Sequence, residues 1–200
     1  DISPHPTAGN VVESWDGSSW TEIAEVNVAR WGMSGAGIAN TAALAFHGYI
    51  QPGSYVGSTE SWDGSSWTEV ADMSVARALG ASSGTVAAAL AFGGQGSSID
   101  NSTTEEWTQA GATDSLVNNG QVFFRSDTGD FKISLTQFGT GTWSSGGNLN
   151  TARFRFGGGV NATQNAGLVF GAGDSPFGQT EEYNGTAWSE QNDMNTGRYI

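Results

Sequence analysis

Residues Glu13–Glu22 read ESWDGSSWTE, and the same ten letters recur without a change at Glu60–Glu69. The offset from Glu13 to Glu60 is 47 residues. A repeat of this length is one supersecondary unit, which buries its apolar face only by stacking against neighbouring units. The period therefore indicates a repeat architecture before the propensity of any single segment is considered.

An Arg follows the second Trp of each copy after ten residues, and two further stretches keep this spacing. The Trp/Arg pairs are Trp20/Arg30, Trp67/Arg77, Trp143/Arg153 and Trp188/Arg198, and the aromatic residues ahead of them are Trp15, Trp62, Trp107 and Tyr183. We therefore expect an N-terminal extension of residues 1–10 and four repeats, at 11–57, 58–104, 105–179 and, in part, 180–200. Recurrence at fixed places indicates that these aromatic and Arg residues are scaffold positions.

Short apolar and small-residue runs in each repeat are bounded by Gly, Ser and Asn clusters, which is typical of strands rather than helices. In the first complete unit we expect four strands, near 32–38, 41–47, 57–63 and 66–71. The stretch Trp15–Trp20 predicts a hairpin loop, in which Asp-Gly supplies the turn and the two Trp face each other. The sequence therefore predicts an all-β fold of four-stranded antiparallel units.

The repeat resembles the kelch repeat, which has an aromatic-Asp hairpin, a Trp five residues after the aromatic, an Arg further on and an apolar strand ending in Gly-Gly. The resemblance covers most of residues 11–107 and 143–200, and it implies the blades of a kelch-like β-propeller. This variety is most similar to kelch-like repeats in structural and tail-fibre proteins of bacteriophages, especially marine ones. His47 and Ala172 depart from the Gly pair of the pattern.

That resemblance implies a non-enzymatic structural or adhesion module of a phage virion, in a tail fibre or appendage. Its partners would be other virion proteins or copies of the chain itself, with a host-surface glycan or protein as a further contact. An alternative is a secreted or cell-surface lectin-like propeller that binds neutral glycans through aromatic residues outside the repeat positions. Few such residues occur: Trp31, Tyr49, Tyr55 and Tyr199. A third alternative is a glycoside hydrolase that uses facing carboxylates.

The repeats do not form a whole number of blades. About 3.7 repeats remain when an insertion in the third repeat is set aside, whereas propellers typically have about 4–8 blades. Residues 11–26 supply only the outer hairpin of one blade, and the inner strands that would complete it are expected after Arg198. We therefore expect that this segment does not close the ring alone: more chain follows, several copies assemble the ring, or the repeats stack as an open array.

The third repeat contains an insertion. Trp107 and Trp143 lie 36 positions apart, where Trp62 and Trp67 lie five apart, so about 31 residues have entered one outer hairpin loop. The inserted residues alternate as Gln121–Arg125, then a polar turn, then Phe131–Leu135, which predicts a β-hairpin at about 112–137. An alternative register ends one array near residue 107 and begins another after the hairpin.

This hairpin is the candidate contact surface, because an isolated two-stranded hairpin is marginal in water and must pack on a blade, a neighbouring copy or a partner. It also resembles a short element of phage tail fibres, of the form Gly-Gln, apolar residues, a polar turn, an apolar residue and Lys. The candidate binding residues are Phe123, Phe124, Arg125, Asp127, Asp130 and Lys132. The alternatives are a protein contact within a particle, a host-receptor contact and a tolerated insertion.

The composition disfavours polyanionic partners. Lys and Arg total 7 against 20 Asp and Glu, which gives a net charge of −13. Nucleic-acid binding requires clustered cations, so no nucleic-acid partner is predicted. The acidic surface fits either a soluble particle protein or a divalent-cation surface. No apolar run approaches the roughly 20 residues of a membrane span, so membrane insertion is not predicted. The chain contains no Cys, so neither a disulfide nor a thiolate metal site is predicted.

No catalytic residue or cofactor is predicted. Imidazole comes only from His5 and His47, and His47 stands at a strand end where other repeats carry Gly, which favours a hydrogen-bonded structural role. Glycosidases place two carboxylates near each other. The acid pairs Glu105/Glu106 and Glu181/Glu182 instead stand at one recurring repeat position, and are therefore expected on different blades.

No metal site is predicted either, because no Asp-rich run has the spacing of a calcium loop. Asp16 and Asp63 are expected to cap their own turns. The Arg that recurs in each repeat is expected to bond carbonyls or a carboxylate between blades. These assignments leave the inserted hairpin as the candidate functional region.

Overall fold

The structure is a computed structural model, which describes residues 9–97, 102–109, 122–125, 130–133, 141–154, 156–158, 163–171 and 178–197. Within these residues every helix or strand assigned is a strand. The strands are β1 (Val12–Trp15), β2 (Trp20–Ile23), β3 (Ser34–Ala39), β4 (Ala42–Ile50), β5 (Ser54–Trp62), β6 (Trp67–Val70), β7 (Ala81–Gly84), β8 (Ala88–Phe92), β9 (Thr104–Thr108), β10 (Val122–Arg125), β11 (Asp130–Ile133), β12 (Thr142–Ser145), β13 (Gly157–Gly158), β14 (Leu168–Phe170), β15 (Thr180–Tyr183) and β16 (Trp188–Gln191). The all-β class predicted from the sequence is confirmed.

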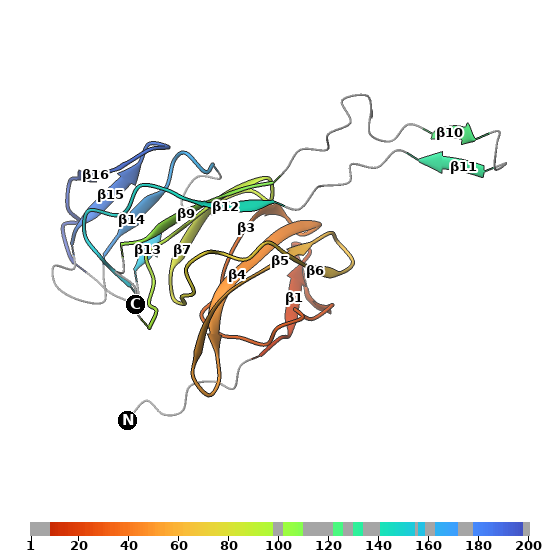
Figure 1. The fold of residues 1–200 in the computed structure, drawn as a ribbon, viewed down its shortest axis with the longest axis horizontal. Coiled ribbons are helices and arrows are strands. Elements are labelled where there is room, and N and C mark those ends of the chain that lie inside the picture. Colours follow the sequence, from red (N-terminus) through yellow and green to blue (C-terminus); the bar gives the residue numbers. More distant parts are fainter. Residues whose placement is uncertain are drawn as a thin grey trace.

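Twelve of these strands form three four-stranded antiparallel sheets. Their strand orders are β3-β4-β5-β6, β7-β8-β9-β12 and β13-β14-β15-β16, while β1-β2 and β10-β11 each form a two-stranded sheet. The three large sheets follow one another across the molecule in chain order (Figure 1). Each is a meander in which every strand pairs with the next, apart from the interval between β9 and β12.

Outer hairpins of all the repeats share one register. The aromatic pairs Trp15/Trp20, Trp62/Trp67, Trp107/Trp143 and Tyr183/Trp188 are directly opposite across the strands, with ring centroids 5.3, 5.3, 5.5 and 5.1 Å apart. Tilted aromatic pairs at such distances stabilise neighbouring antiparallel strands beyond the area they bury. The repeated Trp residues thus belong to the framework of each sheet.

The hairpin β10-β11 lies within the interval between β9 and β12. Trp107 of β9 pairs with Trp143 of β12, so the outer hairpin keeps its register on both sides of the inserted residues. Val122 pairs with Ile133 and Phe124 with Phe131 in the small sheet. Figure 1 shows β10 and β11 well apart from the three large sheets.

The first strands of successive sheets are neighbours. The Ser34 hydroxyl, at the start of β3, donates to the carbonyl of Gly80, just before β7. The Ser82 hydroxyl of β7 donates to the carbonyl of Gly35 in β3. A Cβ on Gly158 of β13 would lie 3.2 Å from that of Ala81, so β13 is close to β7 as well. Small side chains permit this close approach of three backbones.

The core is divided between consecutive sheets. One cluster joins the first and second sheets and contains Leu44, Phe46, Met73, Ala89 and Trp107 among its buried residues. A second cluster joins the second and third sheets and contains Leu90, Phe92, Val169, Tyr183 and Trp188. Each sheet therefore buries its apolar faces against its neighbours, as expected of stacked repeats.

Candidate functional site

Three buried ion pairs fix the segments that lead into the sheets. Arg30, which precedes β3, donates to the Glu60 carboxylate of β5 at 2.8 Å and to the carbonyl of His47 at 2.9 Å. Both side chains of the pair are fully buried. A buried pair offsets its desolvation only when further hydrogen bonds satisfy its remaining donors and acceptors. Here the carbonyl of Ala45 accepts one such hydrogen bond from the Arg30 guanidinium.

The same arrangement recurs in the next two sheets. Arg77 pairs with Glu105 at 3.1 Å, and Arg153 pairs with Glu181. Burial lowers the pKa of Arg77 to about 10, against the opposing effect of Glu105, so its guanidinium is charged at neutral pH. The Arg residues therefore bond both carbonyls and a carboxylate, and they do so within the sheet that their segment enters rather than from blade to blade.

Each of these Glu carboxylates also holds the backbone of its lead-in segment, the residues 27–30, 74–77 and 150–153. Glu60 accepts from the N–H groups of Asn27 and Val28 at 2.6 and 3.3 Å. Glu105 accepts from Ser74 and Val75, and Glu181 from Asn150 and Thr151. All three carboxylates are thus committed to structural hydrogen bonds.

The second acid of the Glu105/Glu106 pair is also engaged. The Tyr183 hydroxyl, on the following sheet, donates to Glu106 at 2.5 Å. Burial, together with this carboxylate, raises the pKa of Tyr183 to about 12. Glu105 and Glu106 therefore take part in two different structural contacts. This arrangement weakens the case for a glycoside hydrolase.

The Asp-Gly turns are closed by their own carboxylates. Asp63 accepts from the N–H groups of Ser65 and Ser66, each at 2.8 Å, and from both hydroxyls. These bonds lower the pKa of Asp63 to about 2, and equivalent bonds lower the pKa of Asp16 further. Among the described residues no group of three or more His, Asp or Glu could hold a metal ion.

His47 is buried next to two cations. Its imidazole is completely inaccessible, and its backbone has the positive φ of 47° that is uncommon outside Gly and Asn. Neither ring nitrogen has a partner at regular hydrogen-bond geometry, although a contact with the Gly32 backbone opposes the lowering of the His47 pKa. Burial, then the charges of Arg77 and Arg30, lower the pKa of His47 to about 3. The ring is therefore neutral and sealed from solvent.

Three aromatic residues that the sequence left scattered come together at one end of the first sheet. Tyr49 of β4 is opposite Tyr55 of β5, and their ring centroids are 5.0 Å apart. Trp31 bridges to Tyr49 at 5.3 Å. All three side chains are partly exposed. This cluster exists because β4 and β5 run for nine residues each, whereas β8 and β9 have five.

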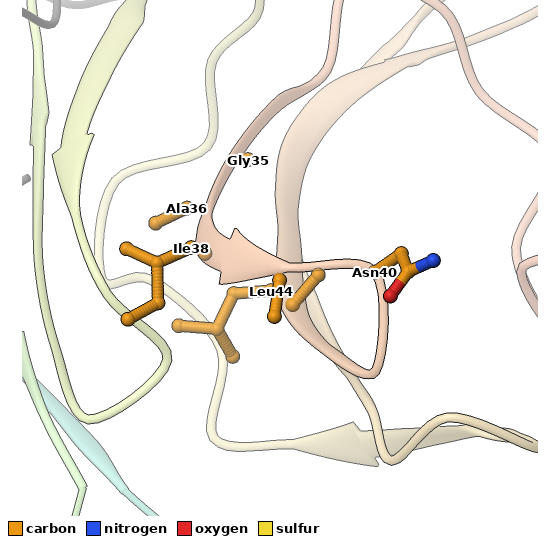
Figure 2. Close-up of a pocket in the computed structure, with 8 residues that line it drawn as sticks. Gly35, Ala36, Ile38, Asn40 and Leu44 are labelled. Carbon is orange, nitrogen blue, oxygen red and sulfur yellow. The ribbon is translucent and has the colours of Figure 1, made fainter. Parts of the chain in front are cut away.

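A shallow hollow of about 460 Å³ lies at the turn between β3 and β4 (Figure 2). Its lining residues are Gly35, Ala36, Gly37, Ile38, Ala39, Asn40, Ala43 and Leu44. Ile38 and Ala36 point to the same side, and Asn40 points away from them (Figure 2). Because no charged or nucleophilic side chain lines it, the hollow offers no catalytic chemistry.

The structure describes only the backbone of the predicted contact residues in the hairpin. Phe123 is opposite Lys132 in the register, and Arg125 is opposite Asp130. Directly opposite residues share a face of an antiparallel pair. Phe123 and Phe124 are therefore assigned to different faces, and the face of Phe124 also carries Val122, Phe131 and Ile133. Asp127, in the predicted turn, lies outside the described residues, as do Arg198 and Tyr199.

No protein-family model matches this chain, and no curated protein is significantly similar to it. In the part of the chain that the structure describes, no helix is long and apolar enough to cross a membrane.

Proposed function

We propose that this chain is a non-enzymatic structural or adhesion module of a bacteriophage virion, in a tail fibre or appendage, and that it acts in the virion. The observation that carries the proposal is the position of β10-β11, set apart from the sheets on an outer hairpin that keeps its own register. Loops held out by a rigid scaffold are common sites of recognition.

The scaffold in this proposal is part of a kelch-like β-propeller. Support comes from three four-stranded meanders in succession, from first strands that are neighbours, and from a core divided between consecutive sheets. The buried Arg–Glu pairs give every sheet the same lead-in. Because each sheet of such a scaffold makes similar contacts with its neighbours, an insertion in one outer loop leaves the packing of the sheets largely unchanged.

The contact surface is the face of the hairpin that carries Val122, Phe124, Phe131 and Ile133 in register. Four apolar positions on one face of an otherwise acidic chain fit an apolar protein surface, on other virion proteins or on copies of this chain, with a host-surface protein or glycan as a further partner. With a net charge of −13, a nucleic-acid partner is not proposed.

The test uses a variant in which residues 108–142 are replaced by Asp-Gly-Ser-Ser, which recreates the Trp62–Trp67 loop between Trp107 and Trp143. Fluorescently labelled protein is applied to intact phage particles and to intact host bacteria. We expect the full chain to bind one of these surfaces, and the excised variant and Phe124→Ser to lose binding. Thr68→Ala, at an exposed position of β6, is the control. Binding that survives excision would overturn the assignment of the hairpin.

A second function, a secreted or cell-surface lectin-like propeller, is favoured by one observation, the Trp31/Tyr49/Tyr55 cluster. Partly exposed aromatic rings suit the apolar faces of neutral sugars. Binding on an array of neutral glycans, lost in Tyr55→Ala and kept after hairpin excision, would establish this function instead. A glycoside hydrolase has weaker support, since Glu105 and Glu181 are held by Arg residues.

A further inference from the structure

The described residues include three complete junctions between an outer hairpin and the sheet that follows it. At each one the lead-in segment leaves one outer hairpin, and two of its N–H groups reach the Glu of the next sheet. In two junctions an Asn side chain also donates to the backbone of the next outer strand: Asn27 to the Trp67 carbonyl and Asn150 to that of Trp188, each at 3.0 Å.

A Trp of the following sheet returns a hydrogen bond at each junction. The indole N–H of Trp143 donates to the Thr59 hydroxyl, and that of Trp188 donates to the Thr104 hydroxyl, both at 3.1 Å. At the first junction the Trp67 indole donates to the Ala24 carbonyl instead. The junction is therefore a defined set of contacts between two surfaces, repeated with small variations.

One half of a fourth junction lies on the N-terminal hairpin. Glu13 occupies the position of Glu60, Glu105 and Glu181, but it is exposed and has no hydrogen-bond or ion-pair partner among the described residues. Trp20 is 64% exposed, although its counterpart Trp188 is 5% exposed. The N-terminal hairpin therefore exposes a carboxylate acceptor and an indole donor whose counterparts form hydrogen bonds in the other three repeats.

The complementary half lies on the third sheet. Asn195 and Thr196 occupy the positions of Asn27 and Val28, and both are exposed, whereas Val28 is partly buried. Thr180 occupies the position of Thr59 and Thr104, and no indole reaches its hydroxyl among the described residues. Two N–H groups, an amide and a hydroxyl are thus available where internal junctions use them.

These two halves do not meet within one chain. Figure 1 shows β1 and β16 on opposite sides of the molecule, with the first and second large sheets between them. Since each half matches the other and neither has a partner among the described residues, a second copy is the occupant that fits. Their chemistry matches group for group, as in the internal junctions.

We propose that copies of this chain associate head to tail, the segment 194–197 and Thr180 of one copy docking on Glu13 and Trp20 of the next. The Glu13 carboxylate accepts from the N–H groups of Asn195 and Thr196. The Asn195 amide donates to the Trp20 carbonyl, and the Trp20 indole donates to the Thr180 hydroxyl. Because the interface joins unlike surfaces, association closes into a ring or continues as a filament, according to the rotation between copies.

The first experiment is sedimentation velocity of the full chain over roughly a hundredfold range of protein concentration. We expect concentration-dependent association that is weakened about tenfold or more by Glu13→Gln and by Thr180→Val, because a charge-assisted and a neutral hydrogen bond are removed. Glu22→Gln is the matched control on the same hairpin and should associate like the parent. Glu13 and Glu22 are exposed and Thr180 is partly buried, and circular dichroism confirms that each variant is folded.

A second experiment tests the direction of the contact. Glu13→Lys blocks one surface and Thr180→Arg blocks the other, so each variant alone should stay monomeric, while an equimolar mixture should form dimers and stop there. A parent chain that is monomeric throughout, association indifferent to Glu13→Lys, or a disulfide within one monomer between Cys residues placed at 13 and 195, would overturn the proposal. The inference does not depend on the hairpin, so it can fail while the proposed contact function stands.

Discussion

In the described part of the chain, three buried Arg–Glu pairs have the same structural role. Each buried guanidinium ties a lead-in segment to the third strand of its sheet, through a carboxylate that also accepts two backbone N–H groups. Removing one partner of such a pair costs far more than the pair itself contributes, since a charge is left buried without a counter-ion.

Glu60→Gln therefore should lower the free energy of unfolding by about 3–5 kcal/mol, since Arg30 would be left buried and uncompensated. Glu13→Gln is the matched control, with the same residue at the same repeat position but no Arg partner among the described residues. Urea denaturation of dilute protein measures both. Equal losses of unfolding free energy in the two variants would show that the Arg30–Glu60 pair does not stabilise the fold in this way.

His47 should make the protein less stable in mild acid. Its folded pKa, about 3, lies below its ordinary value of 6.5, so the unfolded chain binds the proton first. The stabilising contribution is complete above pH 6.5 and is lost as the pH falls towards 3. His47→Asn removes this titration and tolerates the positive φ.

Unfolding free energies of the parent and His47→Asn, measured from about pH 7 to about pH 4, give the test. We expect the parent to lose more stability over this range than the variant. A titration near pH 6.5 of the His47 imidazole resonance, assigned by its absence from the spectrum of His47→Asn, would contradict the burial of this ring.

At the scale of one element, Phe46 of β4 decides how the first sheet packs on the second. It is fully buried and its ring meets that of Trp143 edge-on, with centroids 5.0 Å apart. Phe46→Ala should lower the free energy of unfolding by about 3–5 kcal/mol, through lost burial and the cavity left behind. Ile38→Ala, at an exposed position of β3 in the same sheet, should change it by less than about 0.5 kcal/mol.

The inserted hairpin should be dispensable for folding. Replacing residues 108–142 with Asp-Gly-Ser-Ser keeps Trp107 opposite Trp143 and closes a much shorter loop, which lowers the entropy cost of pairing β9 with β12 by about 1–2 kcal/mol. We expect the excised chain to melt at the same or a higher temperature in calorimetry. A lower melting temperature would show that the hairpin packs on the scaffold.

Much of this element structure follows from local sequence. The expected strands near 32–38, 57–63 and 66–71 correspond to β3, β5 and β6, because Gly, Ser and Asp-Gly clusters mark their ends. The strand expected near 41–47 continues to Ile50 as β4. Cross-strand pairing of Tyr49 with Tyr55 extends β4 past the Gly48 bulge. No local sequence pattern predicts this extension, because it depends on contacts between two strands.

The contacts of the candidate sites were less predictable than the strands. The sequence predicts that Arg30 bonds carbonyls or a carboxylate, but Glu60 follows it by 30 residues, and only the order of strands in the sheet brings the two together. Likewise, the charge of Arg77 lowers the pKa of His47, and Gly80 lies beside its ring; both residues come from the next repeat. Long-range contacts of this kind need the stacking of whole sheets.

At the scale of the whole molecule, stability should fall from the middle of the array towards its N-terminal end. Repeats that contact only their neighbours derive much of their stability from the two interfaces they share. Among the described residues, β1 pairs with β2 alone, so this hairpin belongs to a two-stranded sheet. The hairpin β5-β6 pairs through β5 with β4 and belongs to a four-stranded sheet.

Because Glu13–Glu22 and Glu60–Glu69 have the same ten residues, they form an internal comparison in which intrinsic exchange rates are equal. We expect amide hydrogen exchange, followed by mass spectrometry, to be faster in Glu13–Glu22, since local opening there breaks fewer contacts. Trp15 is exposed while Trp62 is buried and donates its indole N–H to the Asn40 carbonyl. Raising the protein concentration should slow exchange in Glu13–Glu22 and not in Glu60–Glu69 if a second copy docks on the first hairpin, whereas equal rates at low concentration would show that both hairpins are equally supported.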